Sequence, residues 1–131
     1  CQFVNMPITH KTLVMNVLNE NVAVTKSFKF ALKIVKYCEV LELKRKFVVS
    51  NQLLKSGTSI GSNIHEAQNA ESKADFIHKM KIAAKEIDET KYWLMICKES
   101  ENYPSVDQEL DDVLELARIV NKIVSSSKKV N

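Results

Sequence analysis

Residues 53–67 read LLKSGTSIGSNIHEA, and whether they form a loop or a helix decides the fold. The central KSGTSIGSN has the composition of a loop. Small and apolar residues nevertheless recur through it at spacings of four, three, four and three, at Leu53, Gly57, Ile60, Ile64 and Ala67. This is the period of one face of an α-helix. We therefore predict a continuous helix over about residues 47–68.

Gly57 and Gly61 are the two glycines of the chain, and both fall inside this helix. A glycine costs about 1 kcal/mol relative to alanine in a helix interior. The cost is offset where the missing side chain lets a neighbouring backbone approach closely. We therefore predict close helix packing at Gly57 and Gly61.

Three further segments show helical periodicity. One runs from about Thr25 to Glu42, and its two apolar rows require packing on more than one partner. The rows are Phe28, Ala31, Val35 and Cys38, and Phe30, Ile34, Tyr37 and Leu41. The next segment opens with a capping box formed by Ser72 and Asp75, and the last with one formed by Ser105 and Gln108.

Four helices with short connections predict an all-α fold, an antiparallel up-down-up-down four-helix bundle. With 2 glycines, 2 prolines and 45% hydrophobic residues, the 131-residue chain has few breaks and enough apolar side chains for one core. We assign the bundle to residues 22–125. Residues 1–21 are an N-terminal extension of undetermined origin, and residues 126–131 are a frayed tail.

The net charge of +3 is unevenly distributed along the chain. Residues 1–65 carry nine lysines or arginines and three acidic residues, whereas residues 66–131 carry ten and thirteen. We expect part of this contrast to be used between helices, so weak overall basicity does not by itself indicate nucleic-acid binding.

The three cysteines, Cys1, Cys38 and Cys97, lack the spacing of a metal or thiol-exchange motif. We expect Cys38 and Cys97 to be small core residues, and we predict neither a metal nor a cofactor. No apolar run is long enough to span a bilayer, and no signal-peptide pattern opens the chain. We expect a cytoplasmic protein without a membrane partner.

Two neighbouring motifs carry a family resemblance. They are Ser59-Ile60-x-x-Asn63-Ile64-x-Glu66-Ala67 and Glu71-Ser72-Lys73-x-Asp75-Phe76. The stretch resembles four-helix-bundle proteins encoded within intervening sequences of bacterial large-subunit ribosomal RNA genes, and the resemblance extends over about residues 25–125. It is also similar to accessory proteins of diversity-generating retroelements, which work with a reverse transcriptase and its RNA. The resemblance implies an antiparallel bundle that forms a homo-oligomeric ring, with a pentamer favoured.

A row of polar residues, called here the polar row, lies beside the glycines at spacings of four, three, four and three. Its members are Gln52, Ser56, Ser59, Asn63 and Glu66. One interpretation is a hydrogen-bond network between helices or subunits, in which a partly buried Glu66 needs a lysine or arginine partner. The other is an ordinary solvated face.

A second row is basic, and we call it the lysine stripe. It consists of Lys26, Lys29, Lys33 and Lys36, followed closely by Lys44, Arg45 and Lys46. Lysines on one helix face can neutralise phosphates without recognising bases, and repetition around a ring would add weak contacts. A solvated face that maintains solubility is the alternative.

Enzymatic interpretations have little support. His65-Glu66 begins like a zinc motif, but Asn69 stands where the second histidine is needed. Residues 57–63, GTSIGSN, lack the lysine and the preceding strand of a phosphate loop. Nothing fixes Ser59 near His65 or His78 as a nucleophile–base pair. We expect a protein that is not an enzyme and has no small-molecule substrate.

Two functional hypotheses remain. In the first, an oligomeric bundle binds RNA or DNA through its basic face or assists a nucleic-acid machine. Tyr37, Tyr92 and Trp93 could stack on bases there, although core or subunit contacts suit them better. In the second, the bundle is a structural or protein-interaction module with no nucleic-acid role.

Overall fold

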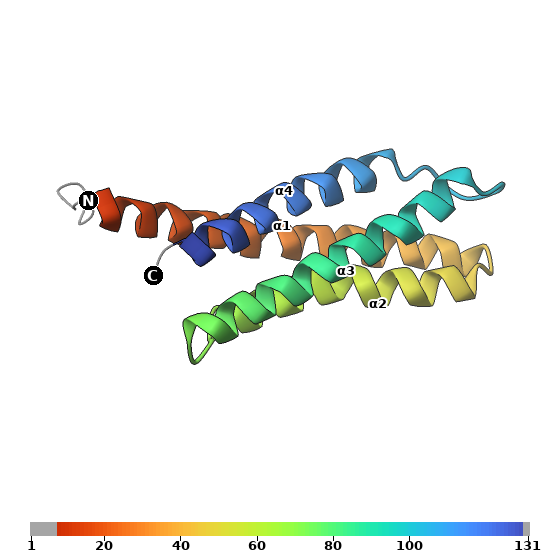
Figure 1. Ribbon diagram of the computed structural model, residues 1–131. Helices are drawn as coiled ribbons and strands as arrows, with labels where there is room; N and C mark the ends of the chain where they lie inside the picture. The colour runs from red at the N-terminus through yellow and green to blue at the C-terminus, as the bar shows by residue number, and fades with distance from the viewer. Residues whose placement is uncertain (1–7, 130–131) are drawn as a thin grey trace.

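In the computed structural model, residues 8–129 are described, with side chains from residue 22 to residue 128. Within that range the chain forms four helices: α1 (Ile8–Leu43), α2 (Phe47–Ala67), α3 (Lys73–Glu99) and α4 (Asp107–Lys129). Short turns join them into an antiparallel bundle (Figure 1). Each helix packs on two neighbours, in the closed order α1, α2, α3, α4 and back to α1. The predicted four-helix bundle is confirmed.

Two helix ends lie beyond their predicted positions. Helix α1 begins at Ile8 instead of near Thr25, and α4 continues to Lys129 instead of ending near residue 125. The first turns of α1 project past the ends of α2 and α3 (Figure 1). An amphipathic period marks the part of a helix that packs on its neighbours, and it need not mark where the helix begins.

Helix α2 runs unbroken through both glycines, as predicted. A Cβ atom on Gly57 would lie 2.9 Å from Cγ2 of Ile34, and one on Gly61 would lie 3.3 Å from the backbone oxygen of Ser27. Both neighbours belong to α1, so α1 and α2 pack closely along the glycine face. The contact at Gly61 is with backbone, and the contact at Gly57 is with a buried side chain.

The predicted cap of α3 forms, and the predicted cap of α4 differs. Ser72 Oγ accepts a hydrogen bond from the backbone N–H of Asp75 at 3.0 Å, and the Asp75 carboxylate accepts from the N–H of Glu71. At α4, Ser105 Oγ accepts from the N–H of Asp107 at 3.4 Å, one residue before Gln108. Because α4 begins at Asp107, the serine lies too far outside the helix for the box predicted with Gln108.

All four helices contribute to one apolar core, in which Cys38 and Cys97 are buried as expected. Cys38 and Ser50 exchange hydrogen bonds between α1 and α2: Cys38 Sγ donates to Ser50 O, and Ser50 Oγ donates to Cys38 O. Burial raises the pKa of the Cys38 thiol to about 11. Tyr37 Oη donates to Pro104 O at 2.8 Å, which ties α1 to the α3–α4 connection.

Candidate assembly and nucleic-acid surfaces

The lysine stripe faces the acidic side of α4. Lys26 Nζ lies 3.0 Å from Glu115 Oε1, and Lys33 Nζ lies 2.6 Å from Asp112 Oδ2. These pairs flank a hollow of about 140 Å³ between the two helices, which Lys29 also lines. Two of the four lysines of the stripe are therefore neutralised within the bundle. The opposite charges of the two halves of the sequence thus meet in the contact between α1 and α4.

The remaining basic residues of the prediction have other surroundings. Lys29 and Lys36 are exposed, and neither forms a salt bridge with a described residue. Lys44 and Arg45 are exposed at the α1–α2 turn, where Arg45 has a left-handed backbone with φ of 62°. Lys46 lies over the ring of Tyr103, with Nζ 5.1 Å from the ring centroid.

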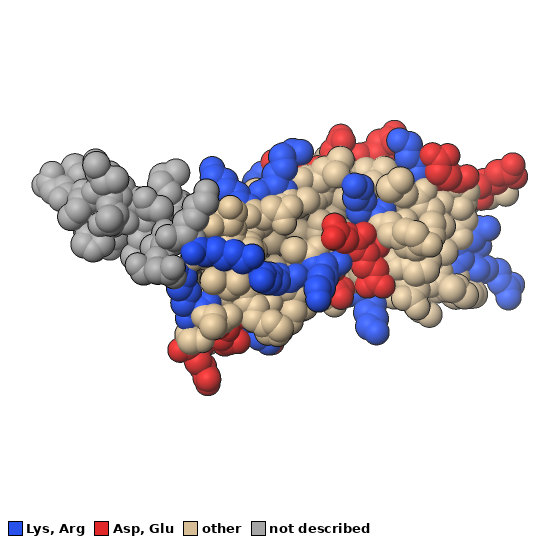
Figure 2. Space-filling view, in the orientation of Figure 1, with Lys and Arg blue, Asp and Glu red and all other residues tan. Residues whose placement is uncertain are grey.

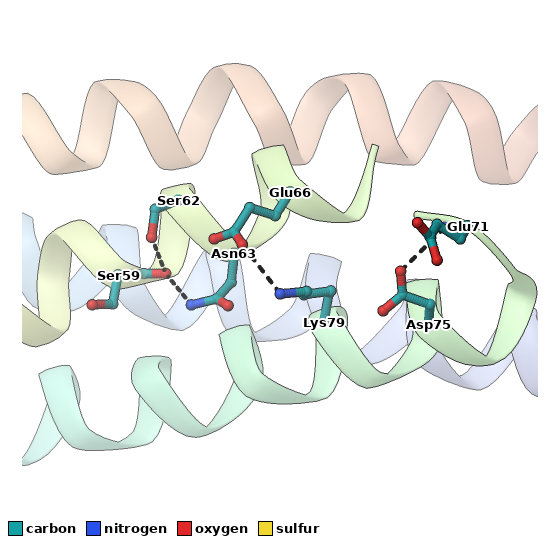
Figure 3. Close-up of polar contacts among 7 residues, drawn as sticks. All are labelled: Ser59, Ser62, Asn63, Glu66, Glu71, Asp75 and Lys79. Atoms are coloured by element: carbon teal, nitrogen blue, oxygen red, sulfur yellow. Dashed lines mark hydrogen bonds and ion pairs between the residues drawn. The ribbon is translucent and has the colours of Figure 1, made fainter. Parts of the chain in front are cut away.

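The polar row lies along the boundary between α2 and α3, and two of its members join the helices. Thr90 Oγ1 donates to the buried Ser56 Oγ at 3.0 Å. Lys79 Nζ donates to Glu66 Oε1 at 3.1 Å (Figure 3). The partner of Glu66 is a lysine, as expected. Because the Glu66 side chain is 57% exposed, the ion pair is only partly shielded from solvent.

Other members of the polar row bond within α2. Asn63 Nδ2 donates to Ser59 O at 2.8 Å, as does Ser62 Oγ at 3.2 Å (Figure 3). Ser59 Oγ donates to Lys55 O. Gln52 is exposed. The row thus combines one buried interhelical bond, one exposed ion pair and several local bonds.

Periodicity did not single out two polar side chains on α3. Glu86 Oε2 and Trp93 Nε1 are buried and have no hydrogen-bond partner within the described part of the chain. Burial, followed by the charge of Glu89, raises the pKa of Glu86. Glu86 lies four residues before Thr90, and Trp93 lies three residues after it. This spacing places both on the same side of α3 as Thr90, and it is the one signal in the sequence that indicates their position.

An apolar row lies on the outward side of α1, and we call it the outward row. Phe28 is 56% exposed, Leu32 49% and Leu43 85%, with Val35 also exposed. Phe28 and Val35 belong to one of the two rows predicted to be packed, whereas the other row is buried entirely: Phe30, Ile34, Tyr37 and Leu41. Within the described chain, the outward row has no helix packed over it.

A hollow of about 420 Å³ lies between the C-terminal half of α3 and the N-terminal half of α4. Its apolar lining residues are Met95, Leu110 and Leu114. Its charged lining residues are Lys91, Lys98, Glu99, Asp107 and Asp111. Met95 and Leu114 are both exposed, so apolar side chains meet solvent at this hollow as well.

The aromatic residues proposed for base stacking occupy different environments. Tyr37 is buried in the core, and its pKa is raised by burial. Tyr92 is 60% exposed and packs edge-on against Trp93, with ring centroids 5.5 Å apart. They therefore do not form a common stacking platform.

The described residues form neither a metal-binding cluster nor a membrane-spanning helix. Between residues 22 and 128, no group of three or more His, Cys, Asp or Glu side chains is placed to hold a metal ion. Of the helices described, none has the length and apolar character needed to cross a bilayer. His65 Nδ1 lies 3.1 Å from Gly61 O on its own helix.

Comparison with known proteins gives a consistent family. The sequence pattern of the 23S rRNA-intervening sequence proteins matches residues 19–126. A solved structure from Bacteroides thetaiotaomicron VPI-5482, described as a protein of unknown function from the S23 ribosomal protein family, is 41% identical, with a TM-score of 0.78. The alignment covers 82% of this chain and 98% of that one. No curated protein matches. The bundle and the matched segment together show that the chain belongs to the 23S rRNA-intervening sequence protein family.

Proposed function

We propose that this protein is a non-enzymatic bundle whose primary function is to assemble with copies of itself into a ring. The observation that carries the proposal is the outward row on α1: Phe28, Leu32, Val35 and Leu43. Contiguous exposed apolar side chains on a helix face are typical of an interaction site. Family resemblance favours five copies.

The hollow between α3 and α4 offers a complementary surface on a second copy. Its apolar side chains would pack on the outward row. Its acidic residues would pair with Lys29 and Lys36, the described α1 lysines that form no salt bridge. These acidic residues are Glu99, Asp107 and Asp111. Two different surfaces that fit each other produce a head-to-tail contact, and head-to-tail contacts close into rings when the rotation allows. This supports a ring over a two-fold dimer.

The test is assembly of variants measured by light scattering coupled to gel filtration. Leu32→Glu and Met95→Glu each place an unpaired charge in one of the two surfaces. Truncating a buried ion pair costs about 3–5 kcal/mol, and a similar cost would weaken self-association at least 100-fold, so either variant should run as a monomer at micromolar concentration. Gln108→Glu is the matched control, because it adds the same charge at an exposed position in the first turn of α4.

Mixing separates head-to-tail assembly from other arrangements. Each single variant retains one intact surface, so an equimolar mixture of Leu32→Glu and Met95→Glu should form a heterodimer with one wild-type interface. A mixture that stays monomeric would show that the two surfaces do not bind each other. A wild-type protein that is monomeric at micromolar concentration would refute ring assembly altogether.

Contact with nucleic acid is the second candidate function. The internal pairing of Lys26 and Lys33 weakens the case for the lysine stripe. A different group of cations, on α3 and α4, favours this function and is developed below.

A further inference from the structure

Five cationic side chains are exposed on the first half of α3 and the second half of α4: Lys81, Lys85, Arg118, Lys122 and Lys128. Lys81 and Lys85 are one helical turn apart, as are Arg118 and Lys122, so each pair shares a face of its helix. Figure 2 shows Lys and Arg side chains gathered on this half of the visible surface. We call these five residues the α3–α4 basic surface.

No described acidic side chain forms a salt bridge with this surface. In contrast, two of the four lysines of the lysine stripe are paired. The nearest acidic residues in sequence are Glu86, which directly follows Lys85 and has one buried carboxylate oxygen, and Glu115, which lies three residues before Arg118 and pairs with Lys26.

The α3–α4 basic surface also places like charges together. Hydrogen-bond contact with Lys128, and then its positive charge, lowers the pKa of Lys81. Two ammonium groups from different helices repel each other when they are close, and an anion between them would relieve the repulsion. Such crowding is a feature of anion-binding sites, where the ligand supplies the missing negative charge.

The chemistry of the surface favours phosphates over an acidic protein. Protein interfaces rely on aromatic and aliphatic anchors and are depleted in lysine. The exposed large apolar residues of the chain lie elsewhere, on α1, at the start of α2 and at the other end of α3 and α4. Between the cations of α4 lie Asn121 and Ser125, which are exposed and are residue types that commonly hydrogen-bond phosphate oxygens.

We propose that Lys81, Lys85, Arg118, Lys122 and Lys128 form a surface that binds the phosphate backbone of a nucleic-acid strand without reading its bases. The surface lies on helix faces other than the outward row, so the proposal does not depend on ring assembly. Neither the sequence-predicted lysine stripe nor base stacking by the aromatic residues is needed for it.

Salt dependence gives a quantitative expectation. For single strands the slope of log K against log salt is about −0.7 for each phosphate contact, so five contacts give about −3.5. The affinity should then fall about 100-fold between 50 and 200 mM salt. Replacing three of the cations should reduce the size of the slope by about 2.

The experiment uses fluorescence anisotropy with the full chain and a labelled oligouridylate of about 12 nucleotides, within the usual range of single-strand site sizes. Lys81→Gln/Lys85→Gln/Lys128→Gln removes three charges of the α3–α4 basic surface. The control variant Lys44→Gln/Arg45→Gln/Lys55→Gln removes the same charge from exposed positions at the α1–α2 turn and on α2, none of which is among the residues proposed for assembly. We expect at least a tenfold loss of affinity for the first variant and less than a threefold loss for the second.

The proposal would be overturned by no binding of the wild type at 50 mM salt, by equal losses in the two triple variants, or by the larger loss in the control variant. Equally tight binding of poly-glutamate would also overturn it, because the partner would then be an acidic protein. Circular dichroism checks that both variants fold, and light scattering shows whether assembly is unchanged, which keeps failure of this proposal distinct from failure of ring assembly.

Discussion

Replacing Gly57 by alanine tests how closely α1 and α2 pack. The new methyl group would lie 2.9 Å from Cγ2 and 3.1 Å from Cγ1 of Ile34, a side chain with no exposed surface. Overpacking of this kind costs about 1–3 kcal/mol, while alanine gains about 1 kcal/mol in helix propensity. We therefore expect Gly57→Ala to lower the free energy of unfolding by about 1 kcal/mol.

A double-mutant cycle with Ile34→Ala isolates the contact. Ile34→Ala removes both atoms nearest to the new methyl group and alone costs about 2–5 kcal/mol. In that background Gly57→Ala should change from destabilising to neutral, or to stabilising by up to about 1 kcal/mol. The reason is that the higher helix propensity of alanine is then its main effect. The assay is urea unfolding followed by far-ultraviolet circular dichroism at one fixed protein concentration. Stabilisation by Gly57→Ala in the wild-type background would refute the close packing of α1 on α2 at this position.

Two further predictions concern buried polar groups. Thr90→Val removes the hydroxyl that donates to Ser56 Oγ between α3 and α2, and it should lower the free energy of unfolding in urea by about 1 kcal/mol. Ser62→Ala, at an exposed hydroxyl that bonds only within α2, is its control, and equal losses would contradict the role of burial. The folded state raises the pKa of Cys38 from 9.0 to about 11, so the native protein keeps the thiol proton to a higher pH than the unfolded chain does. The stability that this difference contributes is complete below pH 9 and is lost as the pH rises toward 11. Cys38→Ala should reduce the alkaline fall in stability over that window, and an unchanged pH profile of urea unfolding would show that this thiol does not contribute.

The helical nature of α2 was predictable because its apolar spacing survives two glycines. Composition favours a loop there, but a continuous face of Leu53, Ile60 and Ile64 can be buried only if the segment is a helix. The lysine or arginine partner expected for Glu66 is Lys79, which lies on α3, across the short α2–α3 turn. The spacing of residues within a helix therefore predicts its contacts best when the helix that it packs on is the next one in the chain.

The surfaces were less predictable, because they depend on which helices become neighbours. Nothing in the spacing of Lys26 and Lys33 shows that Glu115 and Asp112 of α4 lie opposite them. Likewise, α1 has two apolar rows, and its spacing alone does not show that the row with Phe28 and Val35 faces outward. The proximity of Lys81 to Lys128 arises only when α3 and α4 pack, since 46 positions separate them in the sequence.

The closed order of helix contacts has a consequence for how the chain folds. Three of the four contacts join consecutive helices, and such a topology has many local contacts and a low barrier from loop closure. The α1–α4 contact alone among them joins the two ends of the bundle, and both Lys26–Glu115 and Lys33–Asp112 lie in it. We expect opposite charges on the approaching helices to speed the docking of α1 and α4, and added salt to slow it. Glu115 and Asp112 are thus placed to favour the approach of α4 to α1 as well as to hold the final contact.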